Sequence, residues 1–178
     1  EDDYSDVQGM AESLKRLQWY AGSDADYIKR NEVSIYLDHL GVALKTRLDS
    51  VLVDEGLVLD LKTTDSADPE LFTKKVIGLG YDFQAAAYTV AAEQAYGKSF
   101  KFLFVAVERR APYTVAVYEA DEFMQAEGRR KLNAAVNLYK ECEASSEWPG
   151  KEIKVESLSY PSWYTPIETP EHEEEDLF

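Results

Sequence analysis

Residues Arg47–Thr64 read RLDSVLVDEGLVLDLKTT, and this stretch decides the fold. It contains two β-like segments, the end of Val42–Val53 and then Leu57–Lys62, separated by the turn signal at Asp54–Gly56. Two apolar segments joined by so short a turn are typical of a β-hairpin. The stretch therefore predicts two neighbouring antiparallel strands.

Charged side chains lie at corresponding places on these two strands. Side chains two residues apart on a strand share a face, so Asp60 and Lys62 point to the same side of the sheet. Asp49, on the preceding strand, can come alongside Asp60. Two carboxylates close together in a poorly solvated place repel each other strongly, so one takes a proton or a cation lies between them. The pattern favours Mg²⁺, with Mn²⁺ as an alternative and the carbonyl of Leu61 as a further oxygen ligand.

Apolar periodicity and turn signals predict the remaining elements. The expected order is α-β-β-β-α-α-β-β-α, which describes an α/β (α+β) protein with a mixed sheet flanked by helices. A helix is expected in Val7–Lys29, ending near Gly22, and a short one in Glu70–Leu79 with Ser66 or Asp68 as its N-cap. The other expected elements are strands at Glu32–Leu40, Phe100–Val107 and Tyr113–Tyr118, and helices at Tyr81–Tyr96 and Asp121–Ala144.

The alanine-rich helix Tyr81–Tyr96 follows the hairpin and carries two polar side chains on one face. Gln84 and Tyr88 are four residues apart, and Tyr81 lies one turn earlier. Taken alone, such residues most often pack against a sheet, and an acid two residues before a lysine on a hairpin is most often a surface charge pair. Their combination is the informative observation.

This combination resembles a known nuclease superfamily. Asp49, Asp60-Leu61-Lys62 and Gln84-Ala-Ala-Ala-Tyr88 are similar to the D…DxK core and QxxxY motif of RecB-like PD-(D/E)xK nucleases. Several segments between Glu32 and Trp148 resemble, more narrowly, the RecE-type (exonuclease VIII-like) domain of phages and prophages. The resemblance implies a restriction-endonuclease-like core.

The resemblance also implies roles for individual residues. Asp49 and Asp60 would bind the metal, with Glu32 as a further candidate ligand. Lys62 would activate the attacking water and offset charge on the phosphate, and Gln84 and Tyr88 would orient the DNA backbone. The implied reaction is 5′→3′ digestion of one strand at the ends of linear double-stranded DNA. It leaves 3′ single-stranded tails for a RecT-type single-strand annealing protein, and its processivity implies a ring-like homo-oligomer.

Further residues that contact DNA are expected around the same stretch. Each of them, taken alone, is equally consistent with an ordinary surface residue. The candidates are the cations Lys45, Arg47, Lys74 and Lys75 and the hydroxyls of Thr63 and Thr64. The alternatives within this fold are an endonuclease, an end-trimming nuclease and a catalytically inactive DNA-binding scaffold.

Composition narrows the class of protein. The 178 residues carry a net charge of −15, which taken by itself argues against a nucleic-acid-binding protein. The first six residues and Glu168–Phe178 together contribute −10 of this net charge. Binding depends on the local field in a cleft rather than on the net charge of the whole chain. The one cysteine, Cys142, excludes a disulfide framework within the chain.

The expected organisation is a nuclease domain over residues 1–150 and a proline-punctuated acidic tail over residues 151–178. A reducing, cytoplasmic setting fits the single cysteine, and the resemblance to a phage and prophage family implies a bacterial host cell. No apolar run is long enough to span a membrane. RecB-like nucleases usually carry a metal-binding His upstream of the first Asp, but none of the first 38 residues is a His. Either the chain is the C-terminal part of a longer protein, or its metal site is completed differently.

Overall fold

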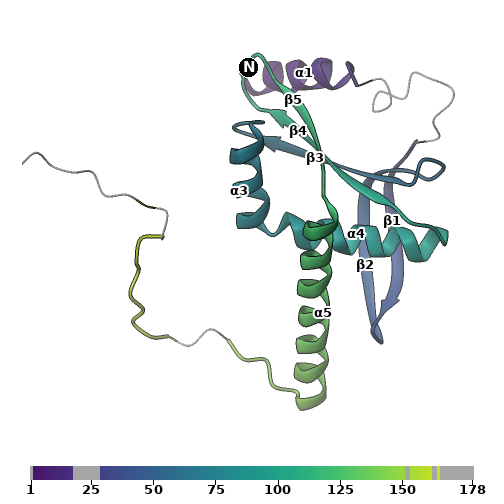
Figure 1. Ribbon diagram of the computed structural model, residues 1–178, viewed down its shortest axis with the longest axis vertical. Helices are drawn as coiled ribbons and strands as arrows, with labels where there is room; N and C mark the ends of the chain where they lie inside the picture. The colour runs from purple at the N-terminus through teal and green to yellow at the C-terminus, as the bar shows by residue number, and fades with distance from the viewer. Residues whose placement is uncertain (1, 18–28, 151–152, 162–163, 165–178) are drawn as a thin grey trace, which may run out of the picture. The chain divides into compact units, whose positions relative to one another are not determined.

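The computed structural model describes residues 2–17, 29–150, 153–161 and 164. The chain divides into two compact units, residues 1–147 and 148–178, and the helices and strands of the described residues all lie in the first. In chain order they are α1 (Asp2–Leu14), β1 (Lys29–His39), β2 (Val42–Leu52), β3 (Leu57–Thr64), α3 (Pro69–Leu79), α4 (Tyr81–Tyr96), β4 (Lys101–Glu108), β5 (Val115–Glu119) and α5 (Glu122–Ser145) (Figure 1).

The five strands form one mixed sheet in the order β1-β2-β3-β4-β5. The pairs β1–β2, β2–β3 and β4–β5 are antiparallel, whereas β3 and β4 are parallel. Parallel neighbours need a long crossover connection, and here α3 and α4 supply it. The mixed sheet and the β2–β3 hairpin predicted from the sequence are both confirmed.

Each face of the sheet packs against different helices. On one face the aromatic side chains of Phe102 and Phe104 pack beneath α3 and α4, together with Val58. On the other face Leu59 and Val105 pack with apolar residues of α1. The alternation of β3 therefore sends its even-numbered residues toward α4 and its odd-numbered residues toward α1.

This alternation is broken at one point in β2. Leu48 and Val51 both lie in the core beneath α3 and α4, although they are three residues apart and a regular strand would place them on opposite faces. Across the ladder, Glu32 of β1 has a left-handed backbone with φ 55°, and the pairing of β1 with β2 skips it. The register of β1 with β2 is the same on both sides of this point, so Asp49 lies opposite Glu32 where both strands are irregular and neither has an inserted residue.

The α3–α4 corner is built by its caps. Asp68 is the N-cap of α3, accepting hydrogen bonds from the backbone N–H groups of Glu70 and Leu71. Gly80 ends α3 and begins α4 with φ 69°, a conformation that strains residues with a Cβ atom. The predicted cap is thus Asp68 rather than Ser66, and Tyr81 is the first residue of α4.

Small residues let α4 lie between the sheet and α5. Ala85, Ala91 and Ala92 are fully buried against the sheet, as the alanine-rich sequence predicts. On the α5 side, a Cβ atom added to Gly128 would lie 2.2 Å from the Asp82 carbonyl oxygen. The close approach of the two helices therefore requires glycine at position 128.

The N-terminal helix differs most from its prediction. The periodicity of Val7–Lys29 predicts a helix that ends near Gly22, but α1 covers Asp2–Leu14. Residues 15–17 form turns, and residues 18–28 lie outside the described part. Strand β1 also begins three residues earlier than predicted, at Lys29, because pairing with Leu52 extends the ladder beyond Glu32.

Among the described residues, no helix combines the length and apolar character needed to span a bilayer.

Candidate functional site

Strand β3 brings Asp60 and Lys62 together beneath α4. Asp60 is completely buried, and the Lys62 side chain is only 13% exposed. Lys62 Nζ lies 2.5 Å from Asp60 Oδ2, so the two side chains form a close ion pair. The predicted shared face of the two side chains is therefore confirmed.

Gln84 on α4 joins both members of this pair. Lys62 Nζ donates a hydrogen bond to Gln84 Oε1 at 2.9 Å, and Gln84 Nε2 donates to Asp60 Oδ1 at 3.1 Å. The amide thus presents its oxygen to the ammonium and its nitrogen to the carboxylate, as their chemistry requires. The three side chains form a closed network between β3 and α4.

Asp49 approaches this network from β2. Its Oδ2 accepts a hydrogen bond from the backbone N–H of Leu61 at 3.0 Å, so the carboxylate reaches over to β3 beside Asp60. Asp49 lies between Leu48 and Val51, which share a face, so it lies where the regular alternation of β2 is interrupted. The two predicted carboxylates are therefore neighbours.

The environment of Asp60 disfavours its charge. Burial raises the pKa of Asp60 from 3.8 to about 6, the Lys62 ammonium lowers it, and the Asp49 carboxylate adds to the rise. One ammonium therefore does not offset the cost of placing this carboxylate in the interior. A second cation near Asp49 and Asp60 would remove that imbalance.

The donor set fits a hard divalent cation. Asp49 and Asp60 offer carboxylate oxygens, and the Leu61 carbonyl lies between Asp60 and Lys62 in the same strand. Within the described ranges, no three His, Cys, Asp or Glu residues come close enough to form a metal-binding group. One or two carboxylates suit Mg²⁺, which keeps several waters and binds substrate phosphate, better than Zn²⁺.

Three other predicted residues lie apart from this network. Glu32 forms an ion pair with Arg47 at 2.6 Å, and both side chains are at least 60% exposed. Tyr88 packs against Phe102, with 6.4 Å between ring centroids. Glu32 is thus held by an arginine, and Tyr88 is held by the core.

The predicted DNA contacts on α3 lie near the end of β3. Lys75 Nζ donates to the Thr63 carbonyl at 3.1 Å and lies 3.4 Å from the hydroxyl of Thr64, which is itself buried. Lys74 points elsewhere and pairs with Glu70 at 2.8 Å. Lys75 therefore contacts the C-terminal end of β3, directly after Asp60 and Lys62.

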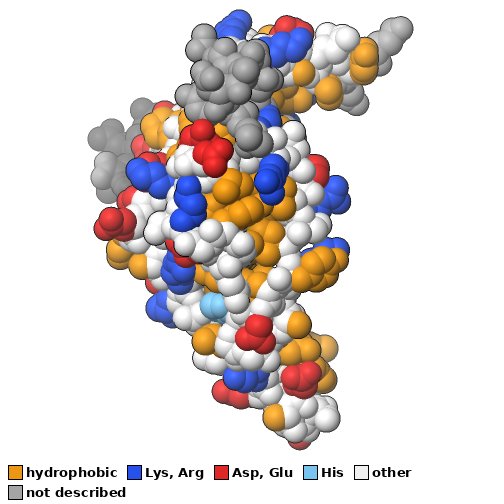
Figure 2. Space-filling model, turned by 90° about the vertical axis from the view of Figure 1, so that its right-hand side faces the viewer, with side chains coloured by type: hydrophobic (Ala, Val, Ile, Leu, Met, Phe, Trp, Pro, Cys, Tyr) orange, Lys and Arg blue, Asp and Glu red, His pale blue; other side chains and the backbone are white. Residues whose placement is uncertain are grey.

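The remaining predicted DNA contact, Lys45, lies on the outer side of the β1–β2 hairpin. Its Nζ is 5.4 Å from the ring centroid of Tyr36, which is exposed. Figure 2 shows that one face of the protein carries several Lys and Arg side chains around an apolar patch. Positive charge is therefore available locally despite the net charge of −15.

The sequence interpretation gave no role to Tyr81. Its ring lies against Lys62, with 4.5 Å from Nζ to the ring centroid. The available signal was its spacing of three residues before Gln84, which places both on one helical face.

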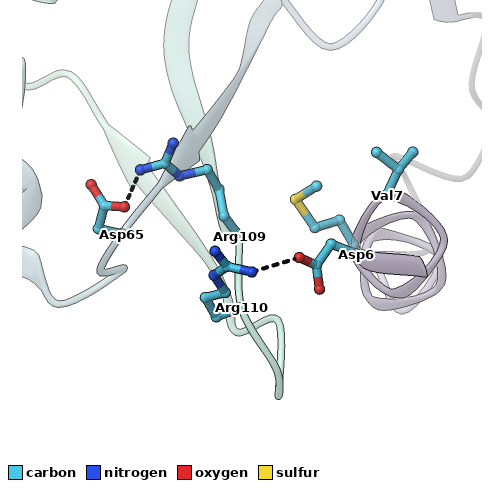
Figure 3. Close-up of a pocket in the computed structure, with 6 residues that line it drawn as sticks. Asp6, Val7, Asp65, Arg109 and Arg110 are labelled. Carbon is cyan, nitrogen blue, oxygen red and sulfur yellow. Dashed lines mark hydrogen bonds and ion pairs between the residues drawn. The ribbon is translucent and has the colours of Figure 1, made fainter. Parts of the chain in front are cut away.

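A separate recess of about 330 Å³ lies near α1 (Figure 3). Its charged groups are paired within it: Arg109 with Asp65, and Arg110 with Asp6 at 3.0 Å. None of the residues of the Asp60 network lines it. The recess lies between α1 and the β4–β5 turn and is distinct from the candidate site.

Comparison with known proteins places this geometry in a family. The model of a PDDEXK-like domain of unknown function (DUF3799) matches residues 1–160. No curated protein matches the chain significantly. Among solved structures, a "Putative exonuclease" from Eubacterium rectale has a TM-score of 0.68 at 14% identity, over 88% of this chain and 63% of that chain. A phage related exonuclease from Haemophilus somnus 129PT has a TM-score of 0.46 at 11% identity, over 83% of this chain and 74% of that chain.

The first of these structures shows the fold, and this chain spans less than two thirds of it. The mixed sheet flanked by helices is the restriction-endonuclease-like core that the resemblance implies. With 160 of 178 residues matched, the chain belongs to the family of PDDEXK-like domains of unknown function.

Proposed function

We propose that this protein is a metal-dependent nuclease that acts as an exonuclease on double-stranded DNA. The observation that carries the proposal is the buried Asp60 carboxylate, held in a closed network with Lys62 and Gln84 and placed next to Asp49. A network that buries a carboxylate and an ammonium is expensive to keep for stability alone. Perturbed carboxylates of this kind are typical of functional sites.

Each side chain has a distinct role in the proposed reaction. Asp49 and Asp60, with the Leu61 carbonyl, would hold Mg²⁺ or Mn²⁺, which supplies an activated water and stabilises charge on the phosphate. Lys62 presents its ammonium where charge develops on the phosphate, and Gln84 fixes its direction. Lys75, Thr63, Lys45 and Arg47 would contact the DNA backbone, which carries no sequence information.

The finer proposal follows the resemblance to RecE-type exonucleases. It comprises 5′→3′ digestion of one strand, 3′ single-stranded tails, transfer to a single-strand annealing protein and a ring-like homo-oligomer in the bacterial cytoplasm. The polarity is tested with a linear duplex labelled at the 5′ or at the 3′ end of one strand. Early release of the 5′ label as a mononucleotide supports it, and early release of the 3′ label contradicts it.

The activity itself is tested on linear, nicked circular and closed circular duplex with Mg²⁺ or Mn²⁺. We expect shortening of the linear duplex alone. Cleavage of closed circles would instead favour an endonuclease, and no cleavage with either ion would favour a DNA-binding scaffold.

Substitution Lys62→Ala tests the site assignment. Removing the ammonium leaves developing phosphate charge without its partner, so we expect the cleavage rate to fall by about 10²-fold or more. Lys15→Ala is the matched control, because Lys15 is an exposed lysine directly after α1 that pairs with Glu12. Circular dichroism verifies that both variants fold, and a Lys62→Ala rate equal to that of Lys15→Ala would refute the assignment.

A further inference from the structure

Tyr81 holds a fixed place beside Lys62. It is the first residue of α4, directly after Gly80, whose φ of 69° forms the sharp corner between α3 and α4. Its ring also packs against Phe104 in the core, with 6.4 Å between ring centroids. The α3–α4 corner and the packing against Phe104 together fix the Tyr81 ring beside the Lys62 ammonium.

The Lys62 ammonium has three N–H bonds and three partners. They are Asp60 Oδ2 at 2.5 Å, Gln84 Oε1 at 2.9 Å and the face of the Tyr81 ring at 4.5 Å from its centroid. A cation over an aromatic face is attracted by the negative potential of the ring, most strongly where water is excluded. The Lys62 side chain is only 13% exposed, so this condition is met.

The three partners are not equivalent for catalysis. Asp60 is the proposed metal ligand, so its oxygen must serve a second cation as well as Lys62. Gln84 is itself tied to Asp60, because its Nε2 donates a hydrogen bond to Asp60 Oδ1 at 3.1 Å, whereas the Tyr81 ring contacts Lys62 through its face. The Tyr81 ring therefore holds the ammonium in a way that does not pass through Asp60.

We propose that Tyr81 is a positioning residue for Lys62 and acts through the face of its ring rather than through its hydroxyl. The proposal rests on the nuclease function proposed above. It predicts that Phe at position 81 preserves the positioning of Lys62, whereas an aliphatic side chain such as Leu does not.

Nuclear magnetic resonance of metal-free protein labelled in its lysine side chains tests the contact directly. A cation over a ring places the neighbouring Cε protons in the ring current, so we expect the Lys62 signal to be displaced upfield in the wild type. Lys62→Arg assigns the signal by its disappearance. The displacement should persist in Tyr81→Phe and vanish in Tyr81→Leu, and an unchanged signal in Tyr81→Leu would overturn the proposed contact.

Kinetics on linear duplex with Mg²⁺ test the consequence. We expect Tyr81→Leu to lower kcat about tenfold with KM changed by less than about threefold, and Tyr81→Phe to stay within about twofold of wild type. Tyr96→Leu is the matched control: it removes a ring from the same helix that packs against Phe100, 5.7 Å away, and its kcat should be unchanged. Thermal unfolding of the three variants is recorded alongside.

Two results would overturn the positioning role. One is an equal loss of kcat in Tyr81→Phe and Tyr81→Leu, which would assign the effect to the hydroxyl. The other is an effect of Tyr81→Leu on KM alone. A wild type that cleaves no DNA would refute the nuclease function, and the lysine signal would still decide separately whether the ring contacts Lys62.

Discussion

At the scale of single residues, Asp60 combines complete burial with a raised pKa. It is completely buried, its pKa is raised to about 6, and its two oxygens face Gln84 and Lys62. The raised pKa means that folding favours the neutral acid relative to the unfolded chain, while the proposed function needs the carboxylate. Stability and metal binding therefore oppose each other at this residue.

Asp60→Asn should show this opposition as a change in pH dependence. The folded state retains a proton that the unfolded chain releases, so stability from this group is present below about pH 4 and is lost as the pH rises to about 6. The amide does not titrate. The free energy of unfolding of the variant minus that of wild type should therefore rise across this window, by up to about 3 kcal/mol. Urea unfolding in EDTA at several pH values measures this difference, and a difference independent of pH would contradict it.

The same titration controls the proposed metal site with the opposite sign. A cation competes with the proton for Asp60, so affinity for Mn²⁺ should increase as the pH rises through about 6. Calorimetric titration of wild type at about pH 5 and pH 7.5 measures this change. Asp60→Asn serves as the control, since it should bind weakly at both values.

At the scale of elements, the site depends on how α4 is held over β3. The network requires Gln84 to reach Lys62 and Asp60, so small shifts of α4 would separate its atoms. Helix α4 is fixed on one side by buried alanines and on the other by α5, where Gly128 allows close contact. The ion pair Lys131–Asp82, with 2.5 Å between Nζ and Oδ2, joins the two helices at the same level.

Gly128→Ala tests the close contact between α4 and α5. A Cβ atom there would lie 2.2 Å from the Asp82 carbonyl oxygen and 2.8 Å from the Ala86 Cβ, so the helices must separate. We expect a loss of about 2 kcal/mol or more in the free energy of unfolding. Gly78→Ala in α3 is the matched control, because its Cβ would meet open space and alanine favours the helix by about 1 kcal/mol. Equal effects of the two substitutions would show that the contact is not tight.

At the scale of the whole molecule, the net charge limits how the proposed DNA substrate could be bound. The chain carries 34 acidic and 19 basic residues, so long-range attraction for a polyanion is weak. In the proposed function, the attraction would come from local cations, such as those on the face shown in Figure 2, and from the proposed metal. Binding should therefore depend on a divalent cation more than in a basic DNA-binding protein.

A binding measurement on linear duplex tests this dependence. Ca²⁺ binds carboxylate and carbonyl oxygens but takes a larger and more flexible coordination than Mg²⁺, so it serves to measure binding apart from reaction. We expect affinity at least about tenfold higher in Ca²⁺ than in EDTA, because the cation offsets repulsion between carboxylates and phosphate. Fluorescence anisotropy with a labelled duplex measures both affinities. Lys15→Ala should behave as wild type, and equal affinities in Ca²⁺ and EDTA would contradict a metal-assisted groove.

Much of the fold was predictable because its signals are local. The bounds of α4 agree with the alanine-rich run between Gly80 and Gly97, and β4 agrees with its apolar segment to within one residue. The end of α1 was predicted wrongly, because apolar spacing continued beyond Leu14 while the backbone did not. Apolar periodicity shows which residues would form the buried face of a helix, but it does not show where the helix ends.

The sequence by itself determined the shared face of Asp60 and Lys62 and the nearness of Asp49, since strand alternation and a short turn leave little freedom. Only the tertiary structure decided what surrounds them. The left-handed backbone of Glu32, its pairing with Arg47 and the place of Tyr81 against Lys62 depend on contacts between distant segments. Such contacts have no local signal, because burial and register are set when the sheet and helices pack together.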